Sequence, residues 1–514
     1  MRAVNFTLRP LALALSATLL AGCGGGSNDN TTGSSPPPPA TPQRGQLLDN
    51  PPTQVGSYSP SDLLTLLGQN ELGKTFLQLA YTPKCTVTVY HLTYETVDPQ
   101  GNLTGASGAL MVPSGSDSGC TGARPVVLYA HGTNTDRDFD IATLDPSSNA
   151  EGVLLAAVFA AEGYIVVAPN YLGYDTSTLG YHPFLIADPQ SKDMTDALAA
   201  ARSALPTAQV PNVSDGGKLF ITGYSEGGYV ALATQRAMQD AGTAVTASAP
   251  MSGPYALAAF GDAIFEGEVS ASANVNLTLL TSAYQEAYAN LYSQPTELYA
   301  PSYAGSIAGL LPSSTAVPDL ESQGKLPAAV FDSTPPSSAY AAYTPATAPA
   351  ALASVFASGF GSDYLIINDY RGAYLADALA HPDGGFPQLT DGLPPASPGN
   401  SLRVDLTAND LRGFVPVAPT LLCGGDSDPT VFFFNTTLVQ QYWQAHPPAT
   451  APVVLDVDSA ASSGDPYASL KAGFAAAKAL VALDGGDAAV LAAYHATLVP
   501  PFCLSAVKSF FDAH

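Results

Sequence analysis

A serine between two glycines is the first feature of this sequence that could do chemistry. The pattern G-Y-S-E-G occupies residues 223–227, between an apolar run at 219–221 and a helix-like run at 229–233. A strand, a tight turn and a helix in this order predict that Ser225 lies on a strained turn with its hydroxyl exposed. The two glycines leave room where a Cβ atom would strike the neighbouring chain. The alternative is that glycine and serine fill an ordinary turn.

Buried strands that alternate with helices are expected around this turn. Compact apolar runs of the kind that form buried parallel strands lie at residues 125–130, 164–168, 219–221, 244–247 and 419–423. Helix-like segments at 153–161 and 194–205 separate the first three runs. This alternation predicts an α/β fold with a doubly wound, mostly parallel sheet.

The alternation stops between about residues 255 and 402, where the chain is rich in Ala, Ser, Pro and Tyr. This segment contains helix-like pieces without obvious buried strands, so we interpret 255–402 as a helical cap inserted into the sheet domain. The two parts of that domain are then 46–254 and 403–514. Within the first part, alternating runs at 86–94 and 108–112 predict a β-hairpin.

Several short segments together resemble a known family. Y-A-H-G-T at 129–133, N-Y-L-G-Y at 170–174, G-Y-H-P-F-L at 180–185 and G-Y-S-E-G-G at 223–228 resemble the secretory lipases of the α/β-hydrolase superfamily, the group similar to Candida lipase A. The resemblance spans about residues 60–514 and is weakest across the cap. It implies an α/β-hydrolase fold, a helical cap over the site and a serine hydrolase of carboxylic esters. Asn170 stands where that family commonly has an aspartate.

A serine hydroxyl attacks effectively only when a histidine takes its proton and an acid orients that histidine. In α/β-hydrolases the chain order is serine, acid, histidine, with the acid after a late strand. The loop G-G-D-S-D-P-T-V at 424–431 follows such a strand and offers two carboxylates. Asp428 has the G-x-x-D-x-x-V spacing of the usual acid loop, so we prefer it to Asp426. For either residue, the alternative is an aspartate that caps a glycine-rich turn.

Three of the seven histidines follow Asp428 in the chain. His446 precedes two prolines at a polar helix end, which is typical of a surface residue, and His514 is the last residue. His495 lies just before the last helix, where the resemblance places the base. We therefore predict His495 as the general base, with a structural histidine as the alternative.

Ester cleavage also needs backbone amides that stabilise the developing oxyanion, and the loss of one costs about 3 kcal/mol. One donor should be the amide of Glu226, which follows the nucleophile at a helix N-terminus. The other should come from the loop H-G-T at 131–133, where we choose Thr133. His131 is expected to shape this loop, and His182 to line the pocket. The Glu226 side chain is assigned no chemistry.

The N-terminal residues predict export. Two arginines flank a short first segment, and the apolar run at 11–20 is too short to span a membrane as a mature helix. The run ends in L-A-G-C, which looks like the lipobox of bacterial lipoproteins and would leave Cys23 as an acylated N-terminus. We expect a signal peptide at 1–22, a Gly/Ser/Pro tether at 23–45, and an exported lipoprotein anchored, by the same resemblance, in the outer membrane. The alternative is an ordinary signal followed by a cysteine.

Four further cysteines remain, an even number that suggests two disulfides in an exported protein. Three pairings are possible. The predicted hairpin would bring Cys85 close to Cys120, so we pair these two and pair Cys423 with Cys503. The second bond would join the acid loop to the histidine segment.

The composition excludes several partners. Among 514 residues, 43 Asp and Glu against 18 Lys and Arg give a net charge of −25, which repels nucleic acid and anionic membrane surfaces. The protein is 46% hydrophobic and 12% charged, which indicates a well-filled core for most of the chain. Neutral or apolar substrates are therefore favoured, and no cofactor or metal is implied.

These observations predict an ester hydrolase of the lipase or esterase type, acting on a small-molecule or lipid ester. Ser225 would attack the acyl carbon, His495 would move the proton and Asp428 would hold the imidazole. A prolyl-type serine peptidase is one alternative, because such peptidases share the fold and the triad. A noncatalytic surface-binding lipoprotein on an inherited fold is another.

Overall fold

The computed structural model describes residues 43–79, 82–208, 210 and 212–514. The predicted signal peptide, Cys23 and nearly all of the predicted tether lie outside the described residues. At the end of that tether, the Arg44 guanidinium pairs with Asp196 at 2.9 Å.

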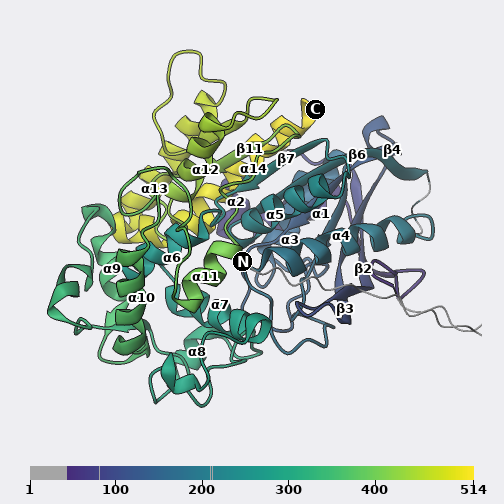
Figure 1. Ribbon diagram of the computed structural model, residues 1–514. Helices are drawn as coiled ribbons and strands as arrows, with labels where there is room; N and C mark the ends of the chain where they lie inside the picture. The colour runs from purple at the N-terminus through teal and green to yellow at the C-terminus, as the bar shows by residue number, and fades with distance from the viewer. Residues whose placement is uncertain (1–42, 80–81, 209, 211) are drawn as a thin grey trace, which may run out of the picture. The chain divides into compact units, whose positions relative to one another are not determined.

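A nine-stranded sheet forms the centre of the described chain (Figure 1), in the order β1-β2-β3-β5-β4-β6-β7-β11-β12. Its strands are β1 (Thr53–Tyr58), β2 (Thr86–Val97), β3 (Leu103–Ser114), β4 (Gly122–Ala130), β5 (Ile165–Pro169), β6 (Val213–Tyr224), β7 (Ala247–Met251), β11 (Leu421–Gly424) and β12 (Val453–Asp456). The first three strands pair antiparallel, and the six from β4 onward are parallel to one another. The predicted mostly parallel sheet is confirmed.

The predicted hairpin is also confirmed, and it is longer than its alternating pattern indicated. Strands β2 and β3 pair continuously from Thr86 with Ser114 to Val97 with Leu103. The Asp98 amide donates to the Asn102 carbonyl at 2.9 Å and closes the turn.

Helices cover both faces of the sheet. They are α1 (Pro60–Leu67), α2 (Glu71–Leu77), α3 (Ala150–Val158), α4 (Ala187–Ala204), α5 (Glu226–Asp240), α12 (Phe434–Ala445), α13 (Ala468–Ala493) and α14 (Val499–Asp512). Helices α4 and α5 contact each other on one face, whereas α3 and α14 contact each other on the opposite face. The apolar segment Ala468–Asp512 has the length and composition of a membrane span, but 61% of its most apolar window is buried inside the structure, as in a core helix.

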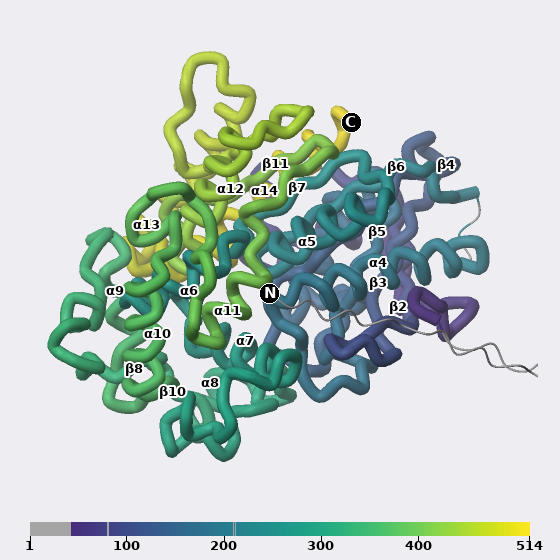
Figure 2. The backbone as a smooth tube through the Cα atoms, viewed as in Figure 1, coloured from purple at the N-terminus to yellow at the C-terminus, as the bar shows by residue number. Residues whose placement is uncertain are grey.

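The segment between β7 and β11 is mostly helical. It contains α6 (Leu257–Phe265), α7 (Ala273–Tyr288), α8 (Val317–Ser322), α9 (Ala353–Ser358), α10 (Asn368–Ala380) and α11 (Ser401–Ala408). Figure 2 shows these elements gathered beside the sheet. Buried ion pairs hold three of the helices together, because Arg403 on α11 binds Asp262 on α6 at 2.8 Å and Asp377 on α10 at 2.7 Å.

The same segment also contains strands that the sequence pattern did not reveal. Short strands β8 (Ala329–Asp332), β9 (Phe360–Gly361) and β10 (Tyr364–Ile366) form a parallel sheet in the order β10-β8-β9. Strands of two to four residues are too short to produce a recognisable hydrophobic period.

The position of one core strand differs from the prediction. The strand was expected at 244–247, but β7 spans Ala247–Met251. It begins later because residues 244–246 are exposed or half-exposed and the buried segment starts at residue 247. Strand β7 has the sequence A-S-A-P-M, and small residues and proline carry little strand propensity. Contacts with α5 and the neighbouring strands override that propensity here.

Candidate active site

The serine turn has the strained geometry that its sequence predicts. Strand β6 ends at Tyr224, α5 begins at Glu226, and Ser225 between them has φ 60° and ψ −123°. Its amide donates to the Met251 carbonyl of β7 at 3.0 Å, which ties the turn to the next strand. A Cβ atom on Gly227 would lie 2.0 Å from the Ala130 carbonyl oxygen. The glycine is therefore required by close packing against β4.

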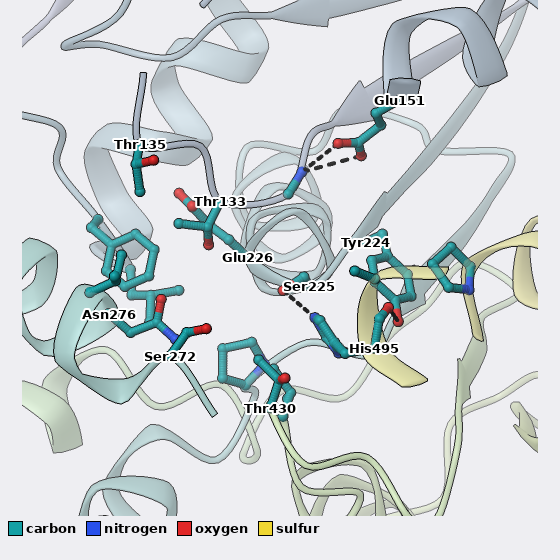
Figure 3. Close-up of a pocket in the computed structure, with 18 of the residues that line it drawn as sticks. Thr133, Thr135, Glu151, Tyr224, Ser225, Glu226, Ser272, Asn276, Thr430 and His495 are labelled. Atoms are coloured by element: carbon teal, nitrogen blue, oxygen red, sulfur yellow. Dashed lines mark hydrogen bonds between the residues drawn. The ribbon is translucent and has the colours of Figure 1, made fainter. Parts of the chain in front are cut away.

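The three residues predicted as a triad lie in hydrogen-bonding contact. Nδ1 of His495 lies 2.6 Å from Oδ2 of Asp428. On the other side of the ring, Nε2 lies 2.8 Å from Oγ of Ser225, and Figure 3 shows this second contact. A carboxylate accepts the Nδ1 proton, which leaves Nε2 to accept the serine proton. The Asp428 side chain is 1% exposed, and its other oxygen accepts from the amides of Thr430 and Val431. The arrangement suits proton transfer from the serine.

The competing acid and bases lie elsewhere. Asp426 is exposed, and its amide donates to Asp456 rather than contacting the histidine. His446 is exposed at the end of α12, with its ring stacked on Tyr442. His514 is exposed at the C-terminus.

His495 lies in a π-helical turn, Tyr494–Leu498, that joins α13 to α14. The Tyr494 hydroxyl donates to Asp458 at 2.7 Å and accepts from the Ser427 amide in the acid loop at 3.1 Å. Single π turns are uncommon and occur frequently at functional sites. The predicted bond between Cys423 and Cys503 is present, with its Cα atoms 5.6 Å apart, so β11 and α14 hold the acid and base segments together. The predicted bond between Cys85 and Cys120 is also present.

The two predicted oxyanion donors both border the cavity beside the serine. Thr133 follows β4, Glu226 begins α5, and both line the same cavity as Ser225 (Figure 3). Among the described residues, neither backbone amide has a protein acceptor. Both amides are thus available to a ligand oxygen.

The Glu151 carboxylate, which the sequence did not indicate as functional, orients the loop that carries Thr133. Glu151 on α3 accepts the Gly132 amide with both oxygens at 3.2 Å and the Tyr129 hydroxyl at 2.6 Å. Its removal from solvent raises the pKa of Glu151 to about 7. Nothing in the sequence around Glu151 indicated that it contacts the oxyanion loop.

A second missed feature is a buried pair behind the serine. The Glu226 carboxylate, which was assigned no chemistry, lies 2.6 Å from Nε2 of His182. Gln190 donates to the same carboxylate oxygen at 2.7 Å. His182 therefore supports the serine turn from the buried interior, where Glu226 holds its ring. The prediction that His182 lines the cavity is wrong. The sequence contains both the Y-H-P and the G-Y-S-E-G segment, but only folding brings the two into contact, so the sequence did not reveal this pair.

His131 has the loop-shaping position that was expected. Its buried ring stacks on Tyr171 with centroids 4.1 Å apart, and its two ring nitrogens face the carbonyls of Gly132 and Asn170. Burial lowers the pKa of His131, which favours the neutral ring.

Asn170, the departure from the family pattern, has a local explanation. Its side-chain amide donates to Ser107 at 2.9 Å and to Asp140 at 3.1 Å, and it lies 3.5 Å from Asp175. An aspartate in this position would place a third carboxylate beside two others and would have no proton to donate.

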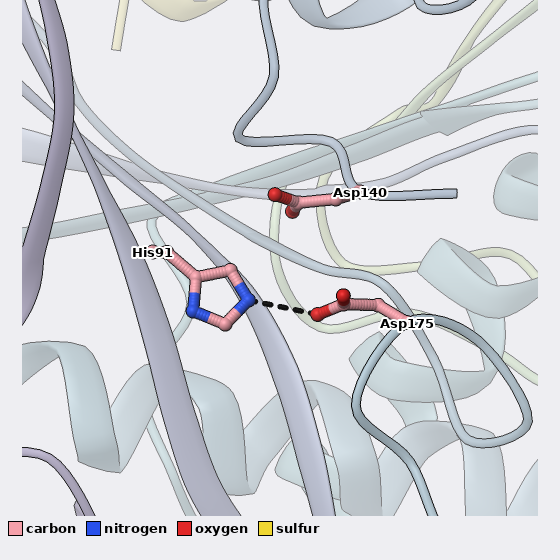
Figure 4. Close-up of side chains that lie close together, drawn as sticks. All are labelled: His91, Asp140 and Asp175. Atoms are coloured by element: carbon pink, nitrogen blue, oxygen red, sulfur yellow. Dashed lines mark hydrogen bonds and ion pairs between the residues drawn. The ribbon is translucent and has the colours of Figure 1, made fainter. Parts of the chain in front are cut away.

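A histidine and two aspartates gather near this asparagine (Figure 4). Nε2 of His91 lies 2.8 Å from Oδ2 of Asp175, with Asp140 nearby. Their residue types would suit a cation, but Asp175 Oδ2 also accepts from Ser107 at 2.6 Å, and Asp140 accepts from the Ala142 amide at 3.0 Å. We interpret the group as a hydrogen-bonded support for the loops beside the oxyanion donors. The bond to Asp175 raises the pKa of His91.

The cavity beside the serine measures about 460 Å³. Its walls come both from segments next to the nine-stranded sheet and from the segment between β7 and β11, and most of the lining residues are apolar. The apolar lining residues include Leu72, Leu154, Phe184, Leu185, Pro254, Phe260, Val275, Val317, Val431, Pro500 and Leu504. The polar ones include Thr135, Ser272, Asn276 and Thr430. A cavity of this kind suits an apolar organic group held by a few polar contacts.

The fold and the site together define the class of this protein. A mostly parallel sheet with a serine directly after β6, an acid in the loop after β11 and a histidine from the turn between α13 and α14, in this chain order, defines the α/β-hydrolase fold. The fold expected from the resemblance is confirmed.

Comparisons with known proteins agree with this class. A sequence profile of the prolyl oligopeptidase family matches residues 154–299, a segment that includes the serine turn. No curated protein matches the chain. The rice cell wall degrading esterase LipA from Xanthomonas oryzae has 24% identity and a TM-score of 0.62 over 89% of this chain and 99% of its own. A putative hydrolase from Legionella pneumophila has 19% identity and a TM-score of 0.61 over 91% of this chain and 97% of its own.

Candida antarctica lipase A is more distant, with 12% identity and a TM-score of 0.39 over 78% of this chain and 75% of its own. At these identities, the esterase and hydrolase structures show a shared fold. A shared fold does not determine the reaction, which depends on the residues of the site.

Proposed function

We propose that this protein is a serine hydrolase that cleaves carboxylic esters through an acyl-enzyme on Ser225. The observation that carries the proposal is the continuous hydrogen-bonded chain from Ser225 through His495 to Asp428 at the wall of an apolar cavity. The available amides of Thr133 and Glu226 border the same cavity. The esterase and hydrolase structures of similar fold support the proposal.

The reaction follows from this geometry. Oγ of Ser225 attacks the ester carbonyl carbon as its proton passes to Nε2 of His495, and Asp428 stabilises the imidazolium. The carbonyl oxygen becomes an oxyanion and accepts hydrogen bonds from the Thr133 and Glu226 amides. His495 returns the proton to the alkoxide leaving group, and the alcohol departs. Water then attacks the acyl-enzyme by the same proton transfers and releases the acid.

Active-site labelling tests the nucleophile. The detergent-solubilised full chain is expected to react with a fluorophosphonate probe on Ser225, and the Ser225→Ala variant is expected to remain unlabelled. A folded wild-type protein that reacts elsewhere or not at all would exclude this reaction. The absence of any labelling would favour the noncatalytic binding protein, which needs no reactive serine.

Asp426 and Asp428 lie two residues apart in the same loop and offer a matched test of the acid. Asp428→Asn is expected to lower kcat by about 10³- to 10⁴-fold, because the amide holds the wrong histidine tautomer. Asp426→Asn removes an exposed carboxylate from the same loop and is expected to retain wild-type kcat. Equal kcat values for the two variants would contradict the assignment of Asp428 as the catalytic acid.

A prolyl-type peptidase is the second candidate, because the prolyl oligopeptidase profile matches the segment that carries Ser225. Proline para-nitroanilides and para-nitrophenyl esters separate the two activities. We expect the larger kcat/KM on the esters. Faster cleavage of the anilides would replace the proposed function with the peptidase.

The proposed substrate is a small-molecule or lipid ester with an apolar acyl or alcohol group. The largely apolar cavity wall supports this class, since it offers few partners to a charged group. A series of para-nitrophenyl esters with increasing acyl length is expected to show KM falling as the chain lengthens, until the cavity of about 460 Å³ is filled. A preference for charged acyl groups would contradict the proposal.

We propose further that the protein is an exported lipoprotein acylated on Cys23 and held in the outer membrane. The lipobox resemblance supports this location, and so do the two disulfides, which persist in oxidising compartments. Metabolic labelling with an alkyne fatty acid is expected to mark the wild type and not the Cys23→Ser variant. Equal labelling of both would place the lipid elsewhere.

A further inference from the structure

The buried contact between His182 and Glu226 has no part in the proton transfers of the triad. Both side chains are almost completely inaccessible, with exposures of 0% and 1%, and Nε2 lies 2.6 Å from the carboxylate oxygen. Gln190, on α4, donates to the same oxygen at 2.7 Å. Burial of two ionisable groups is costly unless they are paired, so this pair must be formed in the folded protein.

One end of the pair is fixed to the loop that follows β5. Nδ1 of His182 faces the Leu172 carbonyl at 2.9 Å, and because a carbonyl only accepts, Nδ1 carries a proton. The ring also packs against Tyr171 and Tyr174, with centroids 5.4 Å and 5.0 Å away. These contacts leave the Nε2 position directed at the Glu226 carboxylate.

The other end of the pair is the residue whose backbone amide faces the cavity. Glu226 is the first residue of α5, directly after Ser225, and it lines the cavity. The positive end of the helix dipole favours a carboxylate at this position. Its side chain and its main chain thus serve different purposes, because the carboxylate anchors the residue while the amide remains available to a ligand oxygen.

We infer that His182 and Glu226 are positioning residues that hold the Glu226 amide in the orientation needed to bind the oxyanion. The inference rests on the proposed ester hydrolysis. The pair joins the loop after β5 to the serine turn, across 44 positions of sequence, and it restrains the peptide that follows the nucleophile. Every substitution of Glu226 except proline keeps the backbone N–H donor, so a loss of rate in such a variant shows that the donor is no longer correctly placed.

Two substitutions of His182 separate its two hydrogen bonds. The amide nitrogen of Gln reaches about where Nε2 lies, so His182→Gln keeps a donor to Glu226. The amide nitrogen of Asn reaches about where Nδ1 lies, so His182→Asn keeps only the donor to Leu172. We expect His182→Asn to lower kcat for a para-nitrophenyl ester by about 10- to 100-fold with KM changed less than threefold, since removing an oxyanion donor outright costs about 10²- to 10³-fold. His182→Gln is expected to recover most of that loss.

Glu226 provides an independent pair of variants. Glu226→Gln keeps an acceptor for Gln190 and a polar contact to His182, whereas Glu226→Met keeps the volume and loses both contacts. We expect Met to lower kcat at least 10-fold more than Gln does. Combining His182→Asn with Glu226→Met is expected to cost no more than the larger single effect, because both remove the same contact.

All rates are referred to the concentration of sites labelled by fluorophosphonate, so that unfolded protein does not count. Equal kcat values for His182→Asn and His182→Gln, or additive losses in the double variant, would overturn the positioning role. If His182→Asn does not fold, the two Glu226 variants decide alone, and equal kcat values for them would overturn it. A wild-type protein without esterase activity or labelling would instead overturn the proposed function.

Discussion

The Tyr224 hydroxyl donates a hydrogen bond of 2.6 Å to the backbone carbonyl of His495, so the residue before the nucleophile holds the turn that carries the base. The two rings also pack together, with centroids 5.0 Å apart. This contact spans 271 positions of sequence and links the end of β6 to the π-helical turn. The distance between Ser225 and His495 therefore also depends on Tyr224.

Removing this hydroxyl should slow catalysis without weakening binding. Tyr224→Phe keeps the ring and loses the hydrogen bond, and we expect kcat to fall about 3- to 10-fold with little change in KM, since such a bond is worth about 1 kcal/mol. Tyr164→Phe is the matched control, because it removes a hydroxyl that binds Asp512 away from the cavity. Steady-state kinetics on one ester measure both variants, and equal kcat values would contradict the role of Tyr224.

The two disulfides should differ in their effect on activity. Replacing either pair with serine is expected to cost about 2–4 kcal/mol of unfolding free energy, since the bonds close sequence separations of 80 and 35 residues. Only the loss of Cys423–Cys503 should also lower kcat, because that bond joins β11, before the acid, to α14, after the base. Activity per labelled site, measured well below the unfolding temperature, tests the difference. Equal kcat values for the two double variants would show that packing alone holds the acid and the base.

The Glu151 carboxylate should make stability depend on pH near neutrality. Its pKa is raised to about 7 in the folded protein, so the native state binds this proton more tightly than the unfolded chain does. The resulting stabilisation is present below the ordinary pKa of 4.5 and is lost as the pH rises through about 7. Glu151→Gln cannot ionise, so its Tm relative to wild type is expected to rise between pH 5 and pH 8. A constant difference across this range would count against the raised pKa.

The His91–Asp175 pair should stabilise the protein in mildly acidic solution. The bond to Asp175 raises the pKa of His91 and the bond to His91 lowers that of Asp175. The histidine contribution is complete below its unfolded pKa of about 6.5 and fades as the pH rises through its folded value. The aspartate contribution is complete above about pH 4 and fades on acidification.

The Tm difference between wild type and His91→Gln is therefore expected to be largest between about pH 4 and pH 6.5 and to shrink above it. His446→Gln is the control, because His446 is exposed and its ring nitrogen faces only a backbone carbonyl. Thermal unfolding over this pH range measures both variants. A difference that grows toward pH 8 would contradict the raised pKa of His91.

The parts of the site that the sequence predicted are those that local chemistry dictates. A nucleophile on a strained turn needs glycines at fixed distances, and Gly227 lies against the Ala130 carbonyl for that reason. The order of Ser225, Asp428 and His495 is the one that the α/β-hydrolase fold uses, with the serine after β6, the acid after β11 and the histidine before the last helix. The hairpin likewise brought Cys85 close to Cys120, because the pairing register of two strands fixes which ends meet.

The sequence by itself thus determined the fold class, the residues that meet at the site and the reaction they can support. Only the tertiary structure decided how those residues are held. Glu151 supports the oxyanion loop from α3, His182 anchors Glu226 from the loop after β5, and β7 is built from small residues that no strand pattern marks. The physical reason is that these are contacts between distant segments, whose energies depend on burial and on the partner brought near by folding. Residue type and local spacing do not indicate which distant residue becomes that partner.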